Sequence, residues 1–344
     1  DVRSTAAAMT ALGACKTVSE VDGWVTYRVQ GGGAADRAAL PGAGVITVDC
    51  GNSGTLMRLL SGAAATRPGR TILTGDASLS SRPMERVATP LRAIGVPITT
   101  TEGHAPIEIE GGAPIEAGTH TLNVASAQVL GAITLASLPA AGVTEIVVPG
   151  PTRDHTERML AWLGVGVTRD GSTTRLTGPA GWEARDIEVP ADSSAAAFWL
   201  VAGALRSDSK IVLEHVGLNP TRTGVIRVLQ RMGVSVEVVP STVSGPEPAG
   251  DLVVTGGARL RAVDLDATDV ADVIDELPVL AVAMAAAEGT STVTGAGELR
   301  VKESDRIRLV VEGLAALGIA VTELEDGWRD RKSTRLNSSH SRAS

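Results

Sequence analysis

The chain has 344 residues, 43% of them hydrophobic, and a formal net charge of −8. Single hydrophobic cores stop growing at roughly 250–300 residues, so this length predicts two domains. One Phe, one Tyr and five Trp provide few side chains that could stack on bases, which argues against a nucleic-acid partner.

The cysteines and the apolar runs indicate the cellular location. Cys15 and Cys50 form neither a CxxC pair nor a Cys/His cluster, which argues against disulfides and structural zinc and is typical of a reducing cytosol. The longest apolar run, residues 277–287, is shorter than the roughly 20 residues of a membrane span. The N-terminus, with Asp1 and Arg3, lacks the build of a signal peptide. We expect a cytoplasmic protein without a metal and without membrane contact.

A repeat runs along the chain. A small polar or acidic residue opens a long Ala/Leu/Val run, and about 40 residues later a second apolar run ends in Gly followed by Val or Ile. The openers are Ser53, Ser126, Ser193 and Asp275, and the closing glycines are Gly95, Gly164, Gly233 and Gly318. Two landmarks that keep a common offset predict one supersecondary unit used repeatedly.

Each unit is predicted to be βαβαββ. The opener is a helix N-cap, and the helix after it is apolar nearly all round and therefore buried. A short strand follows, then an amphipathic helix closed by a C-cap glycine, then further strands. The predicted buried helices cover residues 53–65, 126–138, 193–205 and 275–287, and the strands after them residues 71–73, 144–148, 210–215 and 291–294. The amphipathic helices include residues 83–94, with Pro83 at the first helical position, and 223–232.

The N-termini of the buried helices are candidate anion sites, because free N–H groups and the helix dipole favour negative charge there. These ends lie at residues 51–55, 126–128, 192–194 and 275–276. If the repeats are arranged around a common axis, these helix ends converge and could hold an anionic substrate. The alternative is that their polar residues only cap the helices.

Basic residues favour the first interpretation. Arg82, Arg153 and Arg222 stand at matching strand-to-helix junctions. Three matching positions beside polar caps favour an electropositive rim for phosphate or carboxylate over isolated surface ion pairs.

The segment 298–308 is the most densely charged part of the chain. Its ordinary interpretation is a solvated helix start, with Ser304 as N-cap and Asp305 in the first turn. The alternative is catalytic, because Lys302 and Arg306 would place anion-binding groups beside Glu303, a potential general acid.

Other catalytic motifs are missing from the sequence. His155 has no second ligand at metal spacing and is interpreted as structural. P-loop, GxGxxG, GxSxG and HExxH motifs do not occur. Nucleotide hydrolysis, dinucleotide redox chemistry and serine or zinc hydrolysis therefore lose their usual support.

A series of motifs in order carries a family resemblance. They are DCGNSGTLMRLL, GDASLSSRPM, SAQVLGAITLASL, TRDHTERML, VPADSSAAAFWLVA, GLNPTRTGVIRVLQRMG, IDELPVLAVAMAAAEG and ELRVKESDRI. By these motifs, residues 1–328 resemble the EPSP synthase family, the 3-phosphoshikimate 1-carboxyvinyltransferases.

The resemblance implies an α/β, two-lobed enolpyruvyl-transferase fold of six βαβαββ units, about five of them present here. The first lobe is expected at residues 1–190 and the second at residues 191–328. Residues 329–344 have a basic, Ser-rich composition that breaks the pattern, and we expect them to be a disordered, non-native tail.

The implied reaction moves the enolpyruvyl group of phosphoenolpyruvate onto the 5-hydroxyl of shikimate 3-phosphate and releases phosphate. It belongs to the shikimate pathway, which leads to chorismate and the aromatic amino acids. The resemblance implies no cofactor, a monomer, and these two small molecules as the partners.

Motif by motif, the resemblance also implies the site residues. The shikimate 3-phosphate site would contain Ser126, Ala127, Gln128, Arg153, Asp275 and Lys302, and the phosphoenolpyruvate site Asn52, Gly54, Thr55, Arg82, Gln128 and Arg306. Asp275 is implied as the base for the 5-hydroxyl and Glu303 as the acid for the methylene carbon. Lys302 is implied as a further catalytic residue that holds the phosphoenolpyruvate anion.

Gly54 has a physical reason of its own, because a residue without Cβ lets phosphate approach the helix backbone closely. In the family, glyphosate competes with phosphoenolpyruvate and is accommodated at this glycine. We therefore expect the parent enzyme to be sensitive to glyphosate.

The chain departs from the family pattern at both ends. The family's Pro-Gly-x-Lys-Ser segment has no counterpart before Asp1, and an Asp-His-Arg motif and a further Lys have none after Trp328. A fifth closing glycine, Gly13, has no opener, and no sixth unit follows Gly318. We therefore expect little or no activity from this polypeptide.

Two alternatives stay open. The related UDP-N-acetylglucosamine enolpyruvyl transferase shares the fold, but its usual loop thiol has no counterpart, since no Cys follows Cys50. A non-catalytic substrate-binding remnant would keep the fold without the chemistry. The joint presence of Asp275, Lys302, Glu303 and Arg306 argues against that remnant.

Overall fold

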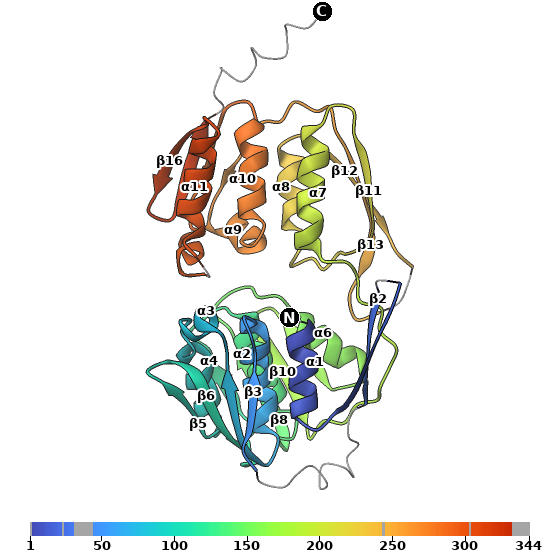
Figure 1. The fold of residues 1–344 in the computed structure, drawn as a ribbon, viewed down its shortest axis with the longest axis vertical. Helices are drawn as coiled ribbons and strands as arrows, with labels where there is room; N and C mark the ends of the chain where they lie inside the picture. The colour runs from blue at the N-terminus through green and yellow to red at the C-terminus, as the bar shows by residue number, and fades with distance from the viewer. Residues whose placement is uncertain (1, 23, 31–43, 243–244, 303, 332–344) are drawn as a thin grey trace, which may run out of the picture. The chain divides into compact units, whose positions relative to one another are not determined.

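The computed structural model describes residues 2–22, 24–30, 44–242, 245–302 and 304–331. The chain divides into two compact units, Asp1–Arg185 and Asp186–Ser344, and Figure 1 traces each of them. The sequence had placed the boundary after residue 190. None of the described helices is both long and apolar enough to cross a membrane.

The described part of the first unit contains two complete βαβαββ copies. One consists of β3 (Ile46–Asp49), α2 (Gly54–Ala65), β4 (Gly69–Thr74), α4 (Glu85–Ala93), β5 (Ile98–Thr101) and β6 (His104–Gly111), with the short helix α3 (Ala77–Ser80) before α4. The other consists of β7 (Thr119–Thr121), α5 (Ala127–Ala136), β8 (Gly142–Val147), α6 (His155–Trp162), β9 (Val167–Asp170) and β10 (Thr173–Gly178). They are preceded by α1 (Val2–Ala11) and the hairpin of β1 (Cys15–Val21) and β2 (Trp24–Gln30), which match the second half of a copy.

The second unit contains two more copies. The third copy consists of α7 (Ser193–Leu205), β11 (Lys210–Gly217), α8 (Gly224–Arg231), β12 (Ser235–Pro240) and β13 (Ala249–Thr255). The fourth consists of β14 (Asp264–Leu265), α9 (Ala267–Val273), α10 (Leu277–Ala286), β15 (Thr290–Val293), the 3-10 helix η2 (Gly297–Val301), α11 (Arg306–Ala316), β16 (Ala320–Leu324) and β17 (Gly327–Arg331). Helices α7 and α10 lie side by side within this unit (Figure 1).

The sheets of the copies share one topology. Their orders are β3-β4-β6-β5, β7-β8-β10-β9 and β14-β15-β17-β16. In each, the first two strands are parallel and the last strand lies antiparallel between the second and the third. The third copy has the order β11-β13-β12, with a parallel bridge from Ala191 to Val216 in the place of a first strand. The predicted βαβαββ repeat is confirmed.

The closing glycines end the second helix of each copy as predicted. Gly13, Gly95, Gly164, Gly233 and Gly318 have φ between 79° and 97°, a region that L side chains rarely adopt. At Gly95, the N–H donates to the carbonyl of Arg92 and the next N–H, of Val96, donates to the carbonyl of Leu91. The other four glycines repeat this pattern, which defines the Schellman motif.

The cores consist mostly of Ala, Val, Leu and Ile, as the composition indicated. The prediction that the first helix of each copy is buried on all sides is wrong for α7. Phe198 and Trp199 of that helix are 62% and 60% exposed, because no described element covers this face.

Several predicted element ends are wrong by one or two residues. Asp192, rather than Ser193, is the N-cap of α7, because its carboxylate accepts the N–H of Ser194. Glu276 is the N-cap of α10, and Asp305 replaces Ser304 as the N-cap of α11 by accepting the N–H of Arg308. Pro83 lies outside α4, which begins at Glu85.

The predicted tail also begins later than expected. Arg329, Asp330 and Arg331 belong to β17, where their backbones pair with Thr292, Ser291 and Thr290 of β15. Strand pairing uses backbone groups, so the polar composition of these three residues did not prevent it. The rest of the expected tail, residues 332–344, lies outside the described residues.

Asp330 is the exception to an apolar core. Its side chain is buried at 1% exposure, and the Trp328 indole N–H is directed at the carboxylate without forming a hydrogen bond of good geometry. Burial raises the pKa of Asp330 to about 6, with the Trp328 indole opposing the shift. The folded state therefore binds this proton more tightly than the unfolded state does, so stability is lost as pH rises through about 6.

We expect Asp330→Val to raise the free energy of unfolding by about 3 kcal/mol at pH 7.5, because a shift of one pKa unit corresponds to about 1.4 kcal/mol. The gain should shrink as the pH falls from about 6 to about 4, between the pKa of the folded carboxyl and its ordinary value of 3.8. Urea denaturation followed by circular dichroism measures it. Glu237→Val, at an exposed position of β12, is the control. A gain that does not change with pH contradicts the assignment.

Candidate active site

In the first unit, the N-termini of two buried helices meet. A Cβ on Gly62 of α2 would overlap the carbonyl oxygen of Ala132 in α5, so these helices touch backbone to backbone. At their N-terminal ends, Gln128 of α5 donates to Thr55 Oγ1 at 2.8 Å and accepts from Arg58 Nη1 at 2.6 Å. Two sets of free N–H groups therefore lie next to each other, an arrangement that favours an anion.

A second network holds the chain that precedes α2. Arg82 Nη2 donates to Asn52 Oδ1 at 2.7 Å, and Asn52 Nδ2 donates to Asp76 Oδ2 at 2.7 Å. The backbone N–H of Leu79 and then the Asn52 amide lower the pKa of Asp76, so its carboxylate stays charged. His104 Nδ1 lies 3.0 Å from the carbonyl oxygen of Arg82. The predicted residues Asn52 and Arg82 are thus brought together.

Gly54, the first residue of α2, lies beside two cations. A Cβ built on it would be 3.1 Å from Arg82 Nη1 and 3.2 Å from Arg58 Nη1. The guanidinium groups therefore flank the first N–H groups of the helix. Sequence reasoning missed Arg58, although its position one turn after Gly54 on the same helix could have indicated it.

Other predicted residues of the first unit lie nearby in the fold. Ser126 and Ala127 begin α5, in the same turn as Gln128. Arg153 is half-buried in the loop between β8 and α6, and α6 packs on α5, since a Cβ on Gly131 would lie 2.9 Å from Thr156 Oγ1.

Two residues considered for other chemistry are unsuited to it. Cys50, two residues before Asn52, is fully buried, and burial raises the pKa of its thiol to about 12. His155 is exposed at the start of α6, and the described residues contain no group of three or more His, Cys, Asp or Glu that could hold a metal.

In the second unit, three predicted residues come together. Asp275 lies in the short turn between α9 and α10. Its Oδ1 is 3.6 Å from Arg306 Nη1 and 3.9 Å from Lys302 Nζ. Lys302 Nζ is also 3.7 Å from Glu298 Oε1. Glu303, the predicted acid, lies outside the described residues.

Arg222 is not part of an exposed basic rim, in contrast to the expectation. Its side chain is 16% exposed and lies 3.7 Å from Glu276 Oε1 and 3.4 Å from Asp192 Oδ1. Two carboxylates therefore balance its charge. Sequence reasoning missed Glu276 as a partner because the two residues are far apart in the chain.

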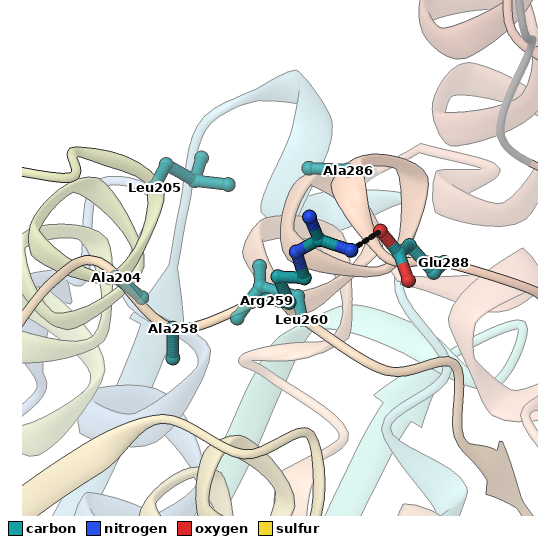
Figure 2. A pocket seen from close by; sticks show the side chains of 7 residues that line it. All are labelled: Ala204, Leu205, Ala258, Arg259, Leu260, Ala286 and Glu288. Atoms are coloured by element: carbon teal, nitrogen blue, oxygen red, sulfur yellow. Dashed lines mark ion pairs between the residues drawn. The ribbon is translucent and has the colours of Figure 1, made fainter.

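A cavity of about 300 Å³ in the second unit is unrelated to these residues. It is lined by Ala204, Leu205, Ala258, Arg259, Leu260, Ala286 and Glu288 (Figure 2). It lies at the C-terminal ends of α7 and α10, where carbonyl groups repel anions. Arg259 and Glu288, 3.8 Å apart, form an exposed ion pair at its edge.

The repeats and their sheet order define the enolpyruvyl transferase fold. The enolpyruvyl transferase NikO from Streptomyces tendae superposes with a TM-score of 0.66 at 18% identity, over 96% of this chain and 74% of that chain. The fold class predicted from the sequence is confirmed.

Within this class, the chain belongs to the EPSP synthase (3-phosphoshikimate 1-carboxyvinyltransferase) family, whose model matches residues 1–344. An EPSP synthase structure from Acinetobacter baumannii superposes with a TM-score of 0.80 at 40% identity, covering 96% of this chain and 73% of that one. This family assignment does not favour the UDP-N-acetylglucosamine enolpyruvyl transferase alternative.

Curated relatives agree with this assignment. The chain is 50% identical over 283 residues to the 3-phosphoshikimate 1-carboxyvinyltransferase of Halorhodospira halophila, which is 82% of this chain and 64% of the relative. It is 45% identical over 328 residues to that of Methylococcus capsulatus, which is 95% of this chain and 73% of the relative. The chain thus spans less than two thirds of the length of the Halorhodospira relative.

The contact between α2 and α5 can be tested with glycine substitutions. We expect Gly62→Ala to lower the free energy of unfolding by about 2–3 kcal/mol, because overlap with a backbone carbonyl outweighs the better helix propensity of Ala. Gly313→Ala in α11 is the matched control, since a Cβ there meets nothing within 4 Å. Gly313→Ala should raise the free energy of unfolding by up to about 1 kcal/mol. Equal effects of both changes in urea denaturation would disprove the close approach.

Proposed function

We propose that this chain carries substrate-binding and acid–base residues of 3-phosphoshikimate 1-carboxyvinyltransferase. The reaction transfers the enolpyruvyl group of phosphoenolpyruvate to the 5-hydroxyl of shikimate 3-phosphate and releases phosphate. Both substrates are phosphorylated carboxylates, so the enzyme must supply several anion-binding groups. The single observation that carries the proposal is the pair of guanidinium groups beside Gly54, at the N-termini of two parallel helices, in a member of this family.

In the first unit, the proposed phosphoenolpyruvate contacts are Asn52, Gly54, Thr55, Arg82 and Gln128. Arg82 supplies a planar, permanently charged fork that matches a carboxylate or phosphate. The Asn52–Asp76 hydrogen bond orients it, since Asn52 contacts both residues. Arg58 joins this set through Gln128.

The proposed shikimate 3-phosphate contacts of the first unit are Ser126, Ala127, Gln128 and Arg153. The N-terminal turn of α5 supports this role, because its N–H groups and Gln128 point to the same end as those of α2.

In the second unit, Asp275 is the proposed base for the 5-hydroxyl and also contacts shikimate 3-phosphate. An ionised carboxylate accepts the hydroxyl proton as the oxygen forms its bond to the enolpyruvyl carbon. Lys302 and Arg306, within 4 Å of Asp275, stabilise negative charge on this carboxylate and on phosphoenolpyruvate. Glu303 is proposed to donate the proton that the methylene carbon takes up in this addition. Loss of a proton from the resulting methyl group, together with departure of phosphate, then restores the carbon–carbon double bond of the product.

A cytoplasmic monomer without a cofactor belongs to the same proposal, supported by the cysteine usage and the family. The second candidate is a remnant that binds shikimate 3-phosphate without turnover. Calorimetry with shikimate 3-phosphate, combined with a phosphate-release assay, separates them. Binding with turnover supports the enzyme, binding alone supports the remnant, and no binding contradicts both.

A methyl group at Gly54 tests the anion site. We expect Gly54→Ala to weaken phosphoenolpyruvate binding about tenfold or more, because the Cβ must displace two guanidinium groups. Glyphosate, which competes for this place in the family, should lose at least as much affinity. Thermal stability should change little, since the displaced atoms are flexible side-chain ends. Titration calorimetry measures both ligands, with Gly313→Ala as control, and unchanged affinities would contradict the placement.

The role of Asp275 is tested by removing its charge. We expect Asp275→Asn to lower kcat by about 10²–10⁴-fold, the usual contribution of a general base. Asp272→Asn is the matched control three residues earlier, where the carboxylate pairs with Arg227 on the surface. Steady-state phosphate release measures both. A similar decrease of kcat in Asp272→Asn would contradict a specific role of Asp275.

A further inference from the structure

A buried ion pair joins the N-terminal ends of α7 and α10. The side chain of Glu276 is 1% exposed, accepts a hydrogen bond from Ser194 Oγ and lies 3.7 Å from Arg222 Nη2. Arg222 Nη2 also donates to Ser194 Oγ at 2.5 Å. The three side chains come from α7, from the loop before α8 and from the start of α10, so they connect three segments of the second unit.

The backbone holds Arg222 in place. In its loop, the N–H of Arg222 donates to the carbonyl of Asn219 at 2.8 Å, and the N–H of Thr221 donates to Asn219 Oδ1 at 2.9 Å. Asn219 is itself buried, and its amide donates to Glu247 at 2.9 Å. The loop is therefore a hydrogen-bonded turn that directs Arg222 toward Glu276.

The residue that follows this loop, Gly224, packs closely against the end of α9. A Cβ on Gly224, the first residue of α8, would lie 2.6 Å from Val273 Cγ1 and 2.7 Å from the carbonyl oxygen of Asp272. Glu276 links α9 to α10, because its N–H donates to Val273 and its carbonyl accepts from Leu280. The turn that contains Asp275 is thus held at both ends.

Asp275 and Glu276 are neighbours with different surroundings. Asp275 is partly exposed and lies beside Lys302 and Arg306, whereas Glu276 is buried beside Arg222. Arg222 precedes α8 in the third copy of the repeat, and Arg82 stands at the matching position before α4 in the first complete copy. Arg82 donates a hydrogen bond to the neutral amide of Asn52, whereas Arg222 forms ion pairs with the carboxylates of Asp192 and Glu276.

A buried ion pair contributes little net stability compared with apolar side chains of the same size, so its use here points to geometry. We propose that Arg222 and Glu276, linked by Ser194, are positioning residues that hold the Asp275 turn toward Lys302 and Arg306. The proposal rests on the proposed function for its catalytic consequence, but the fixing of the turn is a separate, measurable property.

The first arm of the test measures hydrogen exchange in the whole chain. The double variant Arg222→Gln/Glu276→Gln leaves no buried charge unpaired, because Asp192, the other carboxylate beside Arg222, is 62% exposed to solvent. We expect exchange at the hydrogen-bonded amides of Glu276, Val279 and Leu280 to be about tenfold faster or more, because hydrogen bonds to charged groups are lost, while β11 and β13 keep their protection. Arg231→Gln, which removes an exposed pair with Asp269, is the control and should leave these amides unchanged.

Single changes at Ser194 give a milder version of this arm. Ser194→Ala removes the bridging hydroxyl and should accelerate exchange at the amides of Glu276, Val279 and Leu280. Ser194→Thr keeps the hydroxyl and should restore parental exchange. Unchanged exchange in the double variant, or an equal rise throughout the second unit, overturns the positioning role.

The second arm measures phosphate release. We expect the double variant to lower kcat about tenfold or more with the phosphoenolpyruvate KM unchanged, and to add no further loss when Asp275→Asn is already present. Additive losses would overturn the coupling to Asp275. If the parent chain shows no turnover and binds neither substrate, the proposed function fails, while the exchange arm still decides whether Arg222 and Glu276 fix the turn.

Discussion

A helix that is apolar along its length can be polar only at its ends, and this constraint organises both units. Helix α5 is almost entirely buried, and α10 is buried except at Val282 and its ends, so their neighbours must approach closely, as α2 does through Gly62. Because every copy of the repeat runs in the same direction, packed first helices bring like ends together. The unsatisfied N–H groups, the cap residues and the basic side chains therefore collect at one end of each helix pair. The candidate site follows from burial as much as from electrostatics.

The sequence predicted most of this framework. The offset between cap and glycine located four repeats, because a Schellman glycine and an N-cap are local requirements that each copy must meet with its own residues. Motif resemblance then implied Asn52, Gln128, Asp275 and Arg306, whose hydrogen bonds and ion pairs form the polar networks at the ends of the buried helices.

Pairwise side-chain contacts were harder to predict. Arg58 and Gln128, or Arg222 and Glu276, are distant in the sequence and meet only after the helices pack. Cap positions were missed for another reason, since Asp192 and Ser193, or Ser304 and Asp305, are both good cap residues and the choice depends on one local hydrogen bond. The burial of Asp330 was missed because a charged residue in a polar segment is expected to face solvent. In the structure, its strand lies between β15 and β16.

The strand order has a consequence for folding during synthesis. In each complete four-stranded sheet, the strand made last lies between the second and the third, so the third strand has no partner until the fourth leaves the ribosome. A copy can therefore close only when its final residues emerge, and the earlier copies can close while later ones are still being made. The time between completion of one sheet and completion of the next is the time needed to translate one repeat. This time limits how long an unpaired edge strand can pair with another chain.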